Sequence, residues 1–426
     1  MEAGQVRLES GNGTTYNPWP MNTASSKIPR ASIFFLVTGI LLTVSFLLTR
    51  NIPQVADENV HYRQILNTLE NRPFTLDPYT VMIPGYHWTV ALPSFFLHDV
   101  RGATLRLTTT VLSFFTILAF FLVARKIDKD SAVRRSYVFL LFPIIVPFYS
   151  LLYTDIYSMM FIFLALLLAL DHRLWLSGIV GILGLLVRQN NIVWLALIAL
   201  IAYGESYYPQ HRWKDVRRWI ANFFFFFLAA VLIIAFVIWN KGLVLGDHRH
   251  QSFCLNFNNL FFHLFLFFFL FLPFNISNFP KIMVFLKQQK LMILVLAEVF
   301  LGFLLFFRAD HPYNQFARFL HNWILWAMAR PPLITRCFCF LPIAYSILSL
   351  CVTPLRRRSF YLLYPFTVLG LLPNAVIEIR YAFIPYALFI LFKEPDSERI
   401  SLFTIATYVV PLTTILILLL ESSFFP

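Results

Sequence analysis

Uninterrupted apolar runs limit what this chain can fold into. The stretches SIFFLVTGILLTVSFLL (32–48), NFFFFFLAA (222–230) and NLFFHLFLFFFLFLP (259–273) contain no charged residue. A segment that is apolar on every face lies against lipid or other helices, and about 20 such residues span a bilayer as a helix. Only 13% of the residues are charged, against about 25% in soluble domains. The sequence therefore predicts an all-α polytopic membrane protein.

The hydropathy pattern predicts about 11–13 transmembrane helices. Several of the predicted segments are shorter than about 20 residues, which is tolerated where a segment ends at a water-filled cavity inside the membrane. Thirteen segments are predicted: 31–49, 103–124, 137–153, 156–170, 174–187, 192–203, 219–240, 259–273, 291–307, 337–353, 359–376, 381–392 and 400–420. We expect them to form a single transmembrane domain, 31–426, after a polar cytosolic tail, 1–30.

Lysine and arginine set the expected orientation. With the N-terminus in the cytosol, the six internal cytosolic loops hold 18 Lys and Arg in about 59 residues, and the other side holds 12 in about 116. Cytosolic loops are enriched in these residues, so we expect the N-terminus inside and the C-terminus outside. The long loop 50–102 is then the first outer loop, and the sequons NGT (12–14) and NIS (275–277) lie on the cytosolic side.

The remaining composition argues against other classes of protein. The net charge of +13 resides in short loops rather than on a basic face, so nucleic acid is not an expected partner. Four cysteines at 254, 337, 339 and 351 have no zinc-type spacing, and we expect no structural disulfide. The two halves of the chain show no repeat of the kind common in transporters.

Ionisable residues recur at the outer ends of the apolar segments. Asp57, Glu58 and His61 follow the first segment; Asp155, Arg188, Glu378 and Arg380 lie at later outer turns, and Arg106 lies inside an apolar segment. Charges at membrane depth are costly and usually face a cavity or each other. A carboxylate can accept a proton from a hydroxyl nucleophile, and arginine suits a phosphate. This pattern indicates group transfer from a lipid phosphate, although an ion-coupled transporter would also place acids in its helices.

Seven motifs occur together along the chain: ADENVHYRQ (56–64), LDPYTVMIPGYHW (76–88), LYTDIYS (152–158), RQNNIVW (188–194), LVLGDHRHQ (243–251), HPY (311–313) and EIRYAFIPY (378–386). In this order they resemble the dolichyl-phosphate-glucose-dependent alpha-1,2-glucosyltransferases of the endoplasmic reticulum. The resemblance implies a GT-C fold with a lumenal active site in the endoplasmic reticulum membrane. It also implies a dolichyl-phosphate glucose donor, a lipid-linked glycan acceptor, inversion at the sugar, and neither a cofactor nor an obligatory metal. A related transferase with another sugar or acceptor is the alternative.

The resemblance also implies roles for individual residues. Asp57 is the expected general base, with Glu58 orienting His61 or binding the acceptor, and Arg380 is the first candidate for the donor phosphate. Further substrate-binding candidates on the family motifs are Tyr381, Arg188, Gln189, Asn191, Asp155, Asp77, Tyr86, Asp247, His250 and His311. After HPY the chain has NQFARFLHNW (314–323), which lacks the acid expected there.

Structural alternatives remain for these residues. Asp57 could pair with an arginine, Asp155 could be a helix N-cap, and Arg188 and Asn191 could join short helices by buried hydrogen bonds. Asp247 and His250 could lie on a solvated loop. Trp88, Trp194 and Trp323 are predicted to be membrane-interface anchors rather than sugar platforms.

Overall fold

The computed structural model describes residues 30–70, 74–206, 216–246, 255–315, 323–330 and 332–421. Within these ranges the chain is helical, and it contains no strand beyond one isolated bridge between Leu355 and Lys393. The first half holds α1 (Arg30–Thr49), α2 (Glu58–Leu69), α3 (Gly85–Leu97), α4 (Gly102–Ile127), α5 (Ala132–Leu140), η1 (Val146–Tyr149), α6 (Thr154–Leu170), α7 (Leu174–Val187), α8 (Asn191–Ser206) and α9 (Val216–Asn240). The second half holds α10 (Asn258–Leu270), α11 (Leu272–Ser277), α12 (Phe279–Gln288), α13 (Leu291–Phe306), α14 (Pro312–Gln315), α15 (Trp323–Ala329), α16 (Leu333–Val352), η6 (Arg358–Leu362), α17 (Leu363–Leu371), η7 (Ile379–Ala382), α18 (Phe383–Phe392) and α19 (Glu398–Leu420).

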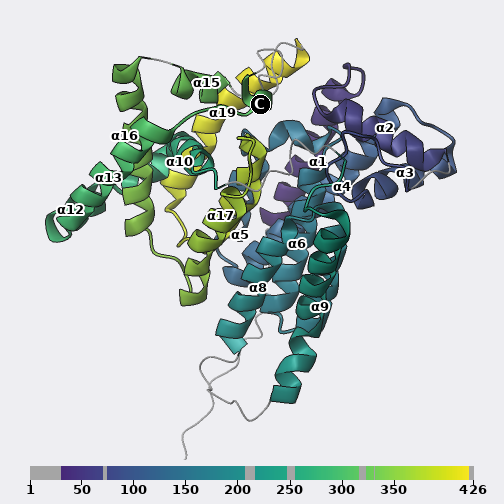
Figure 1. Cartoon of the computed structure of the whole chain (residues 1–426), viewed down its shortest axis with the longest axis horizontal. Helices are drawn as coiled ribbons and strands as arrows, with labels where there is room; N and C mark the ends of the chain where they lie inside the picture. The colour runs from purple at the N-terminus through teal and green to yellow at the C-terminus, as the bar shows by residue number, and fades with distance from the viewer. Residues whose placement is uncertain are drawn as a thin grey trace, which may run out of the picture.

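Five of these helices are long and apolar enough to cross a membrane: α1, α4, α9, α16 and α19. The neighbours α12 and α13 meet the same criterion together but are bent by 106° at their junction. Shorter apolar helices, among them α6, α7, α8 and α10, run beside the long ones (Figure 1). The prediction of an all-α polytopic membrane protein is confirmed.

Several predicted spans are not single helices, 137–153 and 359–376 among them. The segment 137–153 ends its first helix at Leu140 and resumes as the 3-10 helix η1, because Pro143 and Pro147 remove backbone donors and clash with the preceding turn. The segment 359–376 begins as η6, and its α-helix α17 covers only Leu363–Leu371. Predicting one continuous span in each place was wrong.

Contacts between the segment termini fall into two groups at opposite ends of the molecule. At one end, which we call the pocket end, Arg380 pairs with Asp57, and the Asn256 backbone N–H donates to the Leu372 carbonyl over 2.9 Å. At the other, which we call the opposite end, Arg357 pairs with Glu205 over 3.0 Å. The broken segment around 137–153 connects the two ends. Before it, the Arg135 guanidinium donates to the Lys393 carbonyl at the opposite end, and at its close the Tyr153 hydroxyl donates to the Val55 carbonyl at the pocket end.

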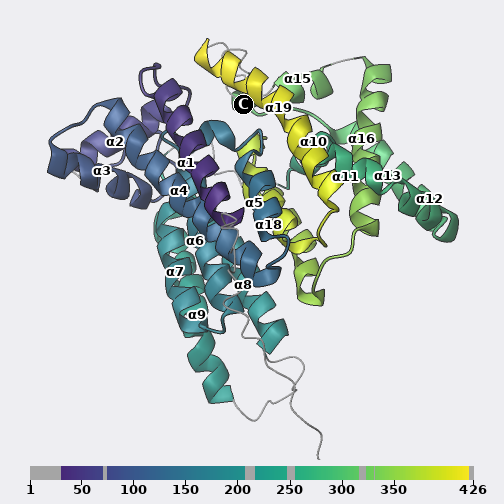
Figure 2. The ribbon, with the colours of Figure 1, turned by 180° about the vertical axis from the view of Figure 1, so that it is seen from behind.

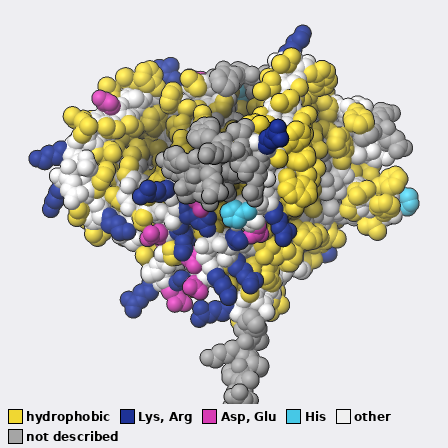
Figure 3. Space-filling view, turned by 90° about the horizontal axis from the view of Figure 1, so that it is seen from below, with side chains coloured by type: hydrophobic (Ala, Val, Ile, Leu, Met, Phe, Trp, Pro, Cys, Tyr) yellow, Lys and Arg dark blue, Asp and Glu magenta, His cyan; other side chains and the backbone are white. Residues whose placement is uncertain are grey.

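The opposite end carries the expected positive charge. Figure 3 looks at the lower side of the molecule in Figure 1, and Lys and Arg side chains gather there over the ends of the helices. This distribution agrees with the charge asymmetry in the sequence. Of the two sequons, Asn12 lies outside the described residues and Asn275 is fully buried, so Asn275 cannot report orientation by carrying a glycan.

Close aromatic and glycine packing holds the helices together. The rings of Phe120 and Phe139 stack at 4.1 Å, joining α4 to α5, and those of Phe360 and Phe392 stack at 4.0 Å. A Cβ on Gly178 would lie 2.5 Å from the Phe225 Cβ, so glycine permits close approach of α7 and α9. Figures 1 and 2 show α6–α9 as one group and α10, α13 and α16 as another, with α5, α17 and α18 between them.

Candidate active site

Asp57 lies at the start of α2, at the pocket end. The preceding Ala56 has φ +51°, a conformation that costs energy for a residue with a Cβ and often marks a functional turn. The Tyr153 hydroxyl accepts from the Asp57 backbone N–H over 3.1 Å and donates to the Val55 carbonyl over 3.1 Å. The Asp57 side chain stays 41% exposed, so this fixed turn presents a carboxylate to solvent.

Glu58 has a different environment although it is the next residue. It is fully buried, and its carboxylate accepts two hydrogen bonds from the Arg106 guanidinium, at 2.6 and 3.1 Å. It also accepts from the backbone N–H groups of Val55 and Leu152, each at 2.8 Å. The prediction that Glu58 orients His61 or binds the acceptor is not supported by this geometry, because its contacts join the first outer loop to α4 and to the segment between η1 and α6.

His61 lies one turn into α2 and is also buried. Its Nδ1 lies 2.9 Å from Nε2 of His87, and its ring meets those of Tyr86 and Tyr153 edge to face. Burial lowers the pKa of His61 to about 4, because the low-dielectric surroundings disfavour the charged imidazolium. His61 is therefore neutral at physiological pH and packs behind Asp57.

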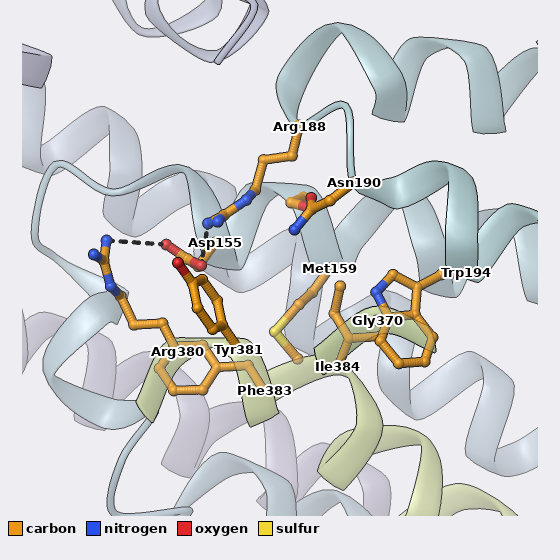
Figure 4. Close-up of a pocket in the computed structure, with 11 residues that line it drawn as sticks. Asp155, Met159, Arg188, Asn190, Trp194, Gly370, Arg380, Tyr381, Phe383 and Ile384 are labelled. Atoms are coloured by element: carbon orange, nitrogen blue, oxygen red, sulfur yellow. Dashed lines mark hydrogen bonds and ion pairs between the residues drawn. The ribbon is translucent and has the colours of Figure 1, made fainter. Parts of the chain in front are cut away.

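A pocket lies beside Asp57, between α6, α7, α8 and the start of α18 (Figure 4). Asp155 lies between Arg188 and Arg380, which approach its carboxylate from two sides. The lining residues are Asp155, Ser158, Met159, Arg188, Asn190, Trp194, Gly370, Arg380, Tyr381, Phe383 and Ile384. Three predicted site residues besides Arg380, namely Asp155, Arg188 and Tyr381, thus meet in one pocket from sequence positions far apart.

Arg380 connects this pocket to Asp57. Its guanidinium lies 2.8 Å from the Asp57 carboxylate, 3.7 Å from that of Asp155, and in direct contact with that of Glu378. The guanidinium also lies over the Tyr153 ring at 5.0 Å. Three carboxylates thus share Arg380, with Arg188 as the second cation, so the cluster has a formal excess of one negative charge.

Two residues of the predicted Arg-Gln-x-Asn motif hold helices rather than line the pocket. The Gln189 side chain contacts backbone groups of Val81, Ile83 and Leu243. The buried Asn191 amide donates to the Gly184 carbonyl over 2.8 Å and accepts from Ser158 over 2.8 Å. The intervening Asn190 lines the pocket and Asn191 does not, so the geometry does not support the prediction of Asn191 as a substrate ligand.

Other predicted residues lie away from the pocket. Asp77 pairs with Arg63 over 2.7 Å, and the buried Tyr86 hydroxyl is 2.8 Å from that of Thr109, so both stabilise the first outer loop. His311 accepts from the Tyr313 backbone N–H over 3.2 Å at the start of α14. These three predictions of substrate binding find no support in the geometry. Asp247 and His250 lie outside the described residues.

Trp194 and Asn314 also contribute to this region, although neither was predicted as a site residue. Trp194 is buried in the pocket, so its prediction as an interface anchor was wrong. Asn314 exchanges two hydrogen bonds with the Ile377 backbone, at 2.9 and 3.0 Å, and so fixes the segment that leads to Glu378 and Arg380. Asparagine at an outer turn carries no distinctive sequence signal, so only the fold could identify Asn314.

A protein metal site needs several His, Cys, Asp or Glu side chains close together. Among the described residues, no three His, Cys, Asp or Glu side chains are grouped so that they could hold a metal ion. The expectation that the reaction needs no obligatory metal stays a prediction.

Comparison with known proteins gives one consistent result. A model of the DIE2/ALG10 family matches residues 52–215 and 205–391. Three curated relatives share the name Dol-P-Glc:Glc(2)Man(9)GlcNAc(2)-PP-Dol alpha-1,2-glucosyltransferase. The protein of Candida glabrata is 29% identical over 48% of this chain and 44% of its own length. The protein of Kluyveromyces lactis is 26% identical over 51% of this chain and 46% of its own length. The protein of Candida albicans is 25% identical over 59% of this chain and 60% of its own length.

These alignments cover roughly half of each relative, from 44% to 60% of its length. No solved structure matches the chain. The family match extends over most of the described residues and includes Asp57, Asp155, Arg188 and Arg380. The chain belongs to the DIE2/ALG10 family.

Proposed function

We propose that this protein transfers glucose from dolichyl-phosphate glucose to a lipid-linked oligosaccharide, forming the terminal alpha-1,2 bond. The observation that carries the proposal is the placement of a partly exposed Asp57 carboxylate against Arg380, at the edge of a pocket lined by Asp155 and Arg188. The shared name of the relatives supplies the donor and the acceptor.

In this mechanism the Asp57 carboxylate removes the proton of the acceptor hydroxyl. The hydroxyl oxygen then forms a bond to C1 of glucose while the bond from C1 to the phosphate oxygen breaks, and dolichyl phosphate leaves. A single displacement inverts the sugar and needs one base on the acceptor side, as in inverting glycoside hydrolysis. Arg380 and Arg188 hold the departing phosphate, which arginine contacts through paired donors.

The shared pairing of Arg380 gives this mechanism an order. A phosphate that binds Arg380 competes with Asp57 for the same guanidinium, so donor binding frees the Asp57 carboxylate and makes it a stronger base, since a nearby opposite charge stabilises the ionised form. Asp155 and Glu378 then leave negative charge beside the sugar, where positive charge develops in an oxocarbenium-like transition state.

The test uses purified protein, dolichyl-phosphate glucose and a lipid-linked glycan that ends in two glucoses, with mass spectrometry of the glycan. Wild type should add one hexose. Asp57→Asn should lower the rate by about 10²–10⁴-fold, the usual contribution of a general base. Asp99→Asn is the matched control, because Asp99 lies in the same loop and pairs with the exposed Arg101. Equal rates for Asp57→Asn and wild type would overturn the assignment of the base.

We also propose that the pocket end faces the lumen of the endoplasmic reticulum. The excess of Lys and Arg at the opposite end supports this orientation. A sequon introduced in the first outer loop by Asp99→Asn with Arg101→Thr should acquire a glycan. One introduced at the opposite end by Asp130→Asn with Ala132→Thr should not. A glycan at the second site and none at the first would mean that the chain has the opposite orientation in the membrane.

A further inference from the structure

A second polar pocket lies at the opposite end, away from the proposed active site. It is lined by Ser131, Arg134, Arg135, Val138, Ile390, Lys393, Pro395, Asp396 and Ser401. These residues come from α5, from the end of α18 and the segment after it, and from the first turn of α19. Figure 2 shows α5, α18 and α19 on the same side of the molecule, and α5 contacts both of the others.

Most of the polar groups of this pocket have fixed partners. The Arg135 guanidinium is buried and donates to the carbonyls of Ile390, Leu391 and Lys393. These bonds satisfy acceptors at the end of α18. Lys393 is buried and pairs with Asp396. Arg135 and Lys393 therefore form a rigid cationic wall.

Two groups of the pocket have no such partner. Arg134 is half-buried and makes no hydrogen bond or ion pair with any residue that the structure describes, and the Ser401 hydroxyl makes none within the same ranges. Both line the pocket beside the N-terminal turn of α19, whose cap is Ser397. A helix N-terminus carries partial positive charge, and Glu398 in the first turn of α19 offsets part of it.

The charges in the pocket do not balance. Arg134, Arg135 and Lys393 give three positive charges, and Asp396 is the only carboxylate among the lining residues. The nearby Asp128 is already paired with Arg356. Uncompensated cations at the edge of the hydrocarbon region are unfavourable, so a site of this kind gains free energy from an anion.

The other lining residues narrow the chemistry of that anion. Val138, Ile390 and Pro395 supply apolar surface next to the cations. A free phosphate would gain nothing from that surface, whereas a phospholipid brings a phosphate and an apolar glycerol and acyl region together. We infer that this pocket binds the headgroup phosphate of an anionic phospholipid in the leaflet at the opposite end. The site is separate from the proposed transfer reaction and does not depend on it.

The experiment measures lipid binding to the full-length, delipidated protein in detergent by native mass spectrometry. Phosphatidylinositol is the anionic probe and phosphatidylcholine is the zwitterionic one. We expect one phosphatidylinositol to bind more tightly than phosphatidylcholine. Arg134→Gln should weaken its binding about fivefold, since one basic residue near an anionic lipid contributes about that factor. Ser401→Leu should weaken it as well, by filling the pocket without changing the charge.

Arg125→Gln is the matched control, because it removes one exposed positive charge at the same end but outside the pocket. Binding by this variant should equal that of wild type. An equal loss of phosphatidylinositol binding in Arg125→Gln and Arg134→Gln would mean that general surface charge attracts the lipid, and would overturn the assignment of the pocket as its binding site. Equal binding of the two lipids would also overturn it, and displacement of phosphatidylinositol by excess inorganic phosphate would assign the site to free phosphate instead. If Ser401→Leu fails to fold, Arg134→Gln still decides the matter.

Discussion

The two ends of this molecule use charge in different ways. At the opposite end, outside the cationic pocket, two partly exposed ion pairs each join one acid to one base: Arg357 with Glu205, and Lys126 with Asp171. At the pocket end, Arg380 is shared by three carboxylates. A one-to-one ion pair on the surface can be replaced by other residues at little cost. An arginine that is shared by several carboxylates can bind a ligand in place of one of them and keep the others. This difference is consistent with the proposal that substrates bind at the pocket end.

The pocket end also contains the pair with the largest expected effect on stability. Removing Glu58 leaves the buried Arg106 charge without its partner, and breaking a buried pair usually costs about 3–5 kcal/mol. Glu58→Ala should therefore lose most of the folded protein, measured by unfolding in mixed detergent and by size-exclusion profiles.

The double variant Glu58→Gln with Arg106→Met serves as the control, because replacing both charges removes the uncompensated one. It should be more stable than Glu58→Ala. If Glu58→Ala is as stable as wild type, this pair does not anchor the first outer loop.

A second prediction compares Arg380, at the pocket end, with Arg357, at the opposite end. Arg380→Lys keeps the charge but loses the planar set of donors, so transfer should slow by about tenfold to a hundredfold, the equivalent of one charge-assisted hydrogen bond of about 1.5–3 kcal/mol. Arg357→Lys, at the opposite end, should leave the rate unchanged. Steady-state rates at saturating donor and across donor concentrations test both. Equal rates for the two variants would remove the distinction between the ends.

A third prediction concerns pH. The pKa of His61 is lowered to about 4 in the fold, below about 6.5 in the unfolded chain. The unfolded state therefore binds the proton first as pH falls. The contribution of neutral His61 is complete above about pH 6.5 and is lost as pH falls toward 4, amounting to about 2 kcal/mol between pH 7.5 and 5.

Unfolding free energies of wild type and His61→Phe at pH 7.5 and 5 measure this loss. His61→Phe should lose less stability on acidification, and His87, whose pKa is also lowered by burial, accounts for part of what remains. An identical pH dependence in the two proteins would mean that His61 is not buried in the neutral form.

The smallest effect is expected at the opposite end. Glu205 and Arg357 are 29% and 33% exposed, and pairs of this kind contribute about 0–1 kcal/mol. Glu205→Gln should therefore change the free energy of unfolding by less than about 1 kcal/mol and leave transfer intact. A loss as large as that of Glu58→Ala would show that both ends depend on buried charge to the same degree.

Asp57 and Glu58 show what a sequence motif can and cannot predict. Both were predicted from the same short motif, and both are acids. Asp57 faces the pocket edge and Glu58 is enclosed by Arg106 and backbone donors. The motif predicts which residues contribute to the site. Their partners, Arg106 of α4 and Arg380 of η7, lie far away in the chain, so the motif does not predict the role of each acid. The same holds for Asn190 and Asn191, whose roles depend on which side of the start of α8 each one occupies.

The sequence by itself determined the all-α membrane class, the excess of basic residues at one end and the family, because apolar run length, Lys and Arg density and motif order are local properties of the chain. Only the tertiary structure decided that Asp155, Arg188 and Arg380 share one pocket and that Arg134 and Ser401 line a second pocket. These results depend on contacts between residues far apart in the sequence, and such contacts are fixed by the packing of all the helices together.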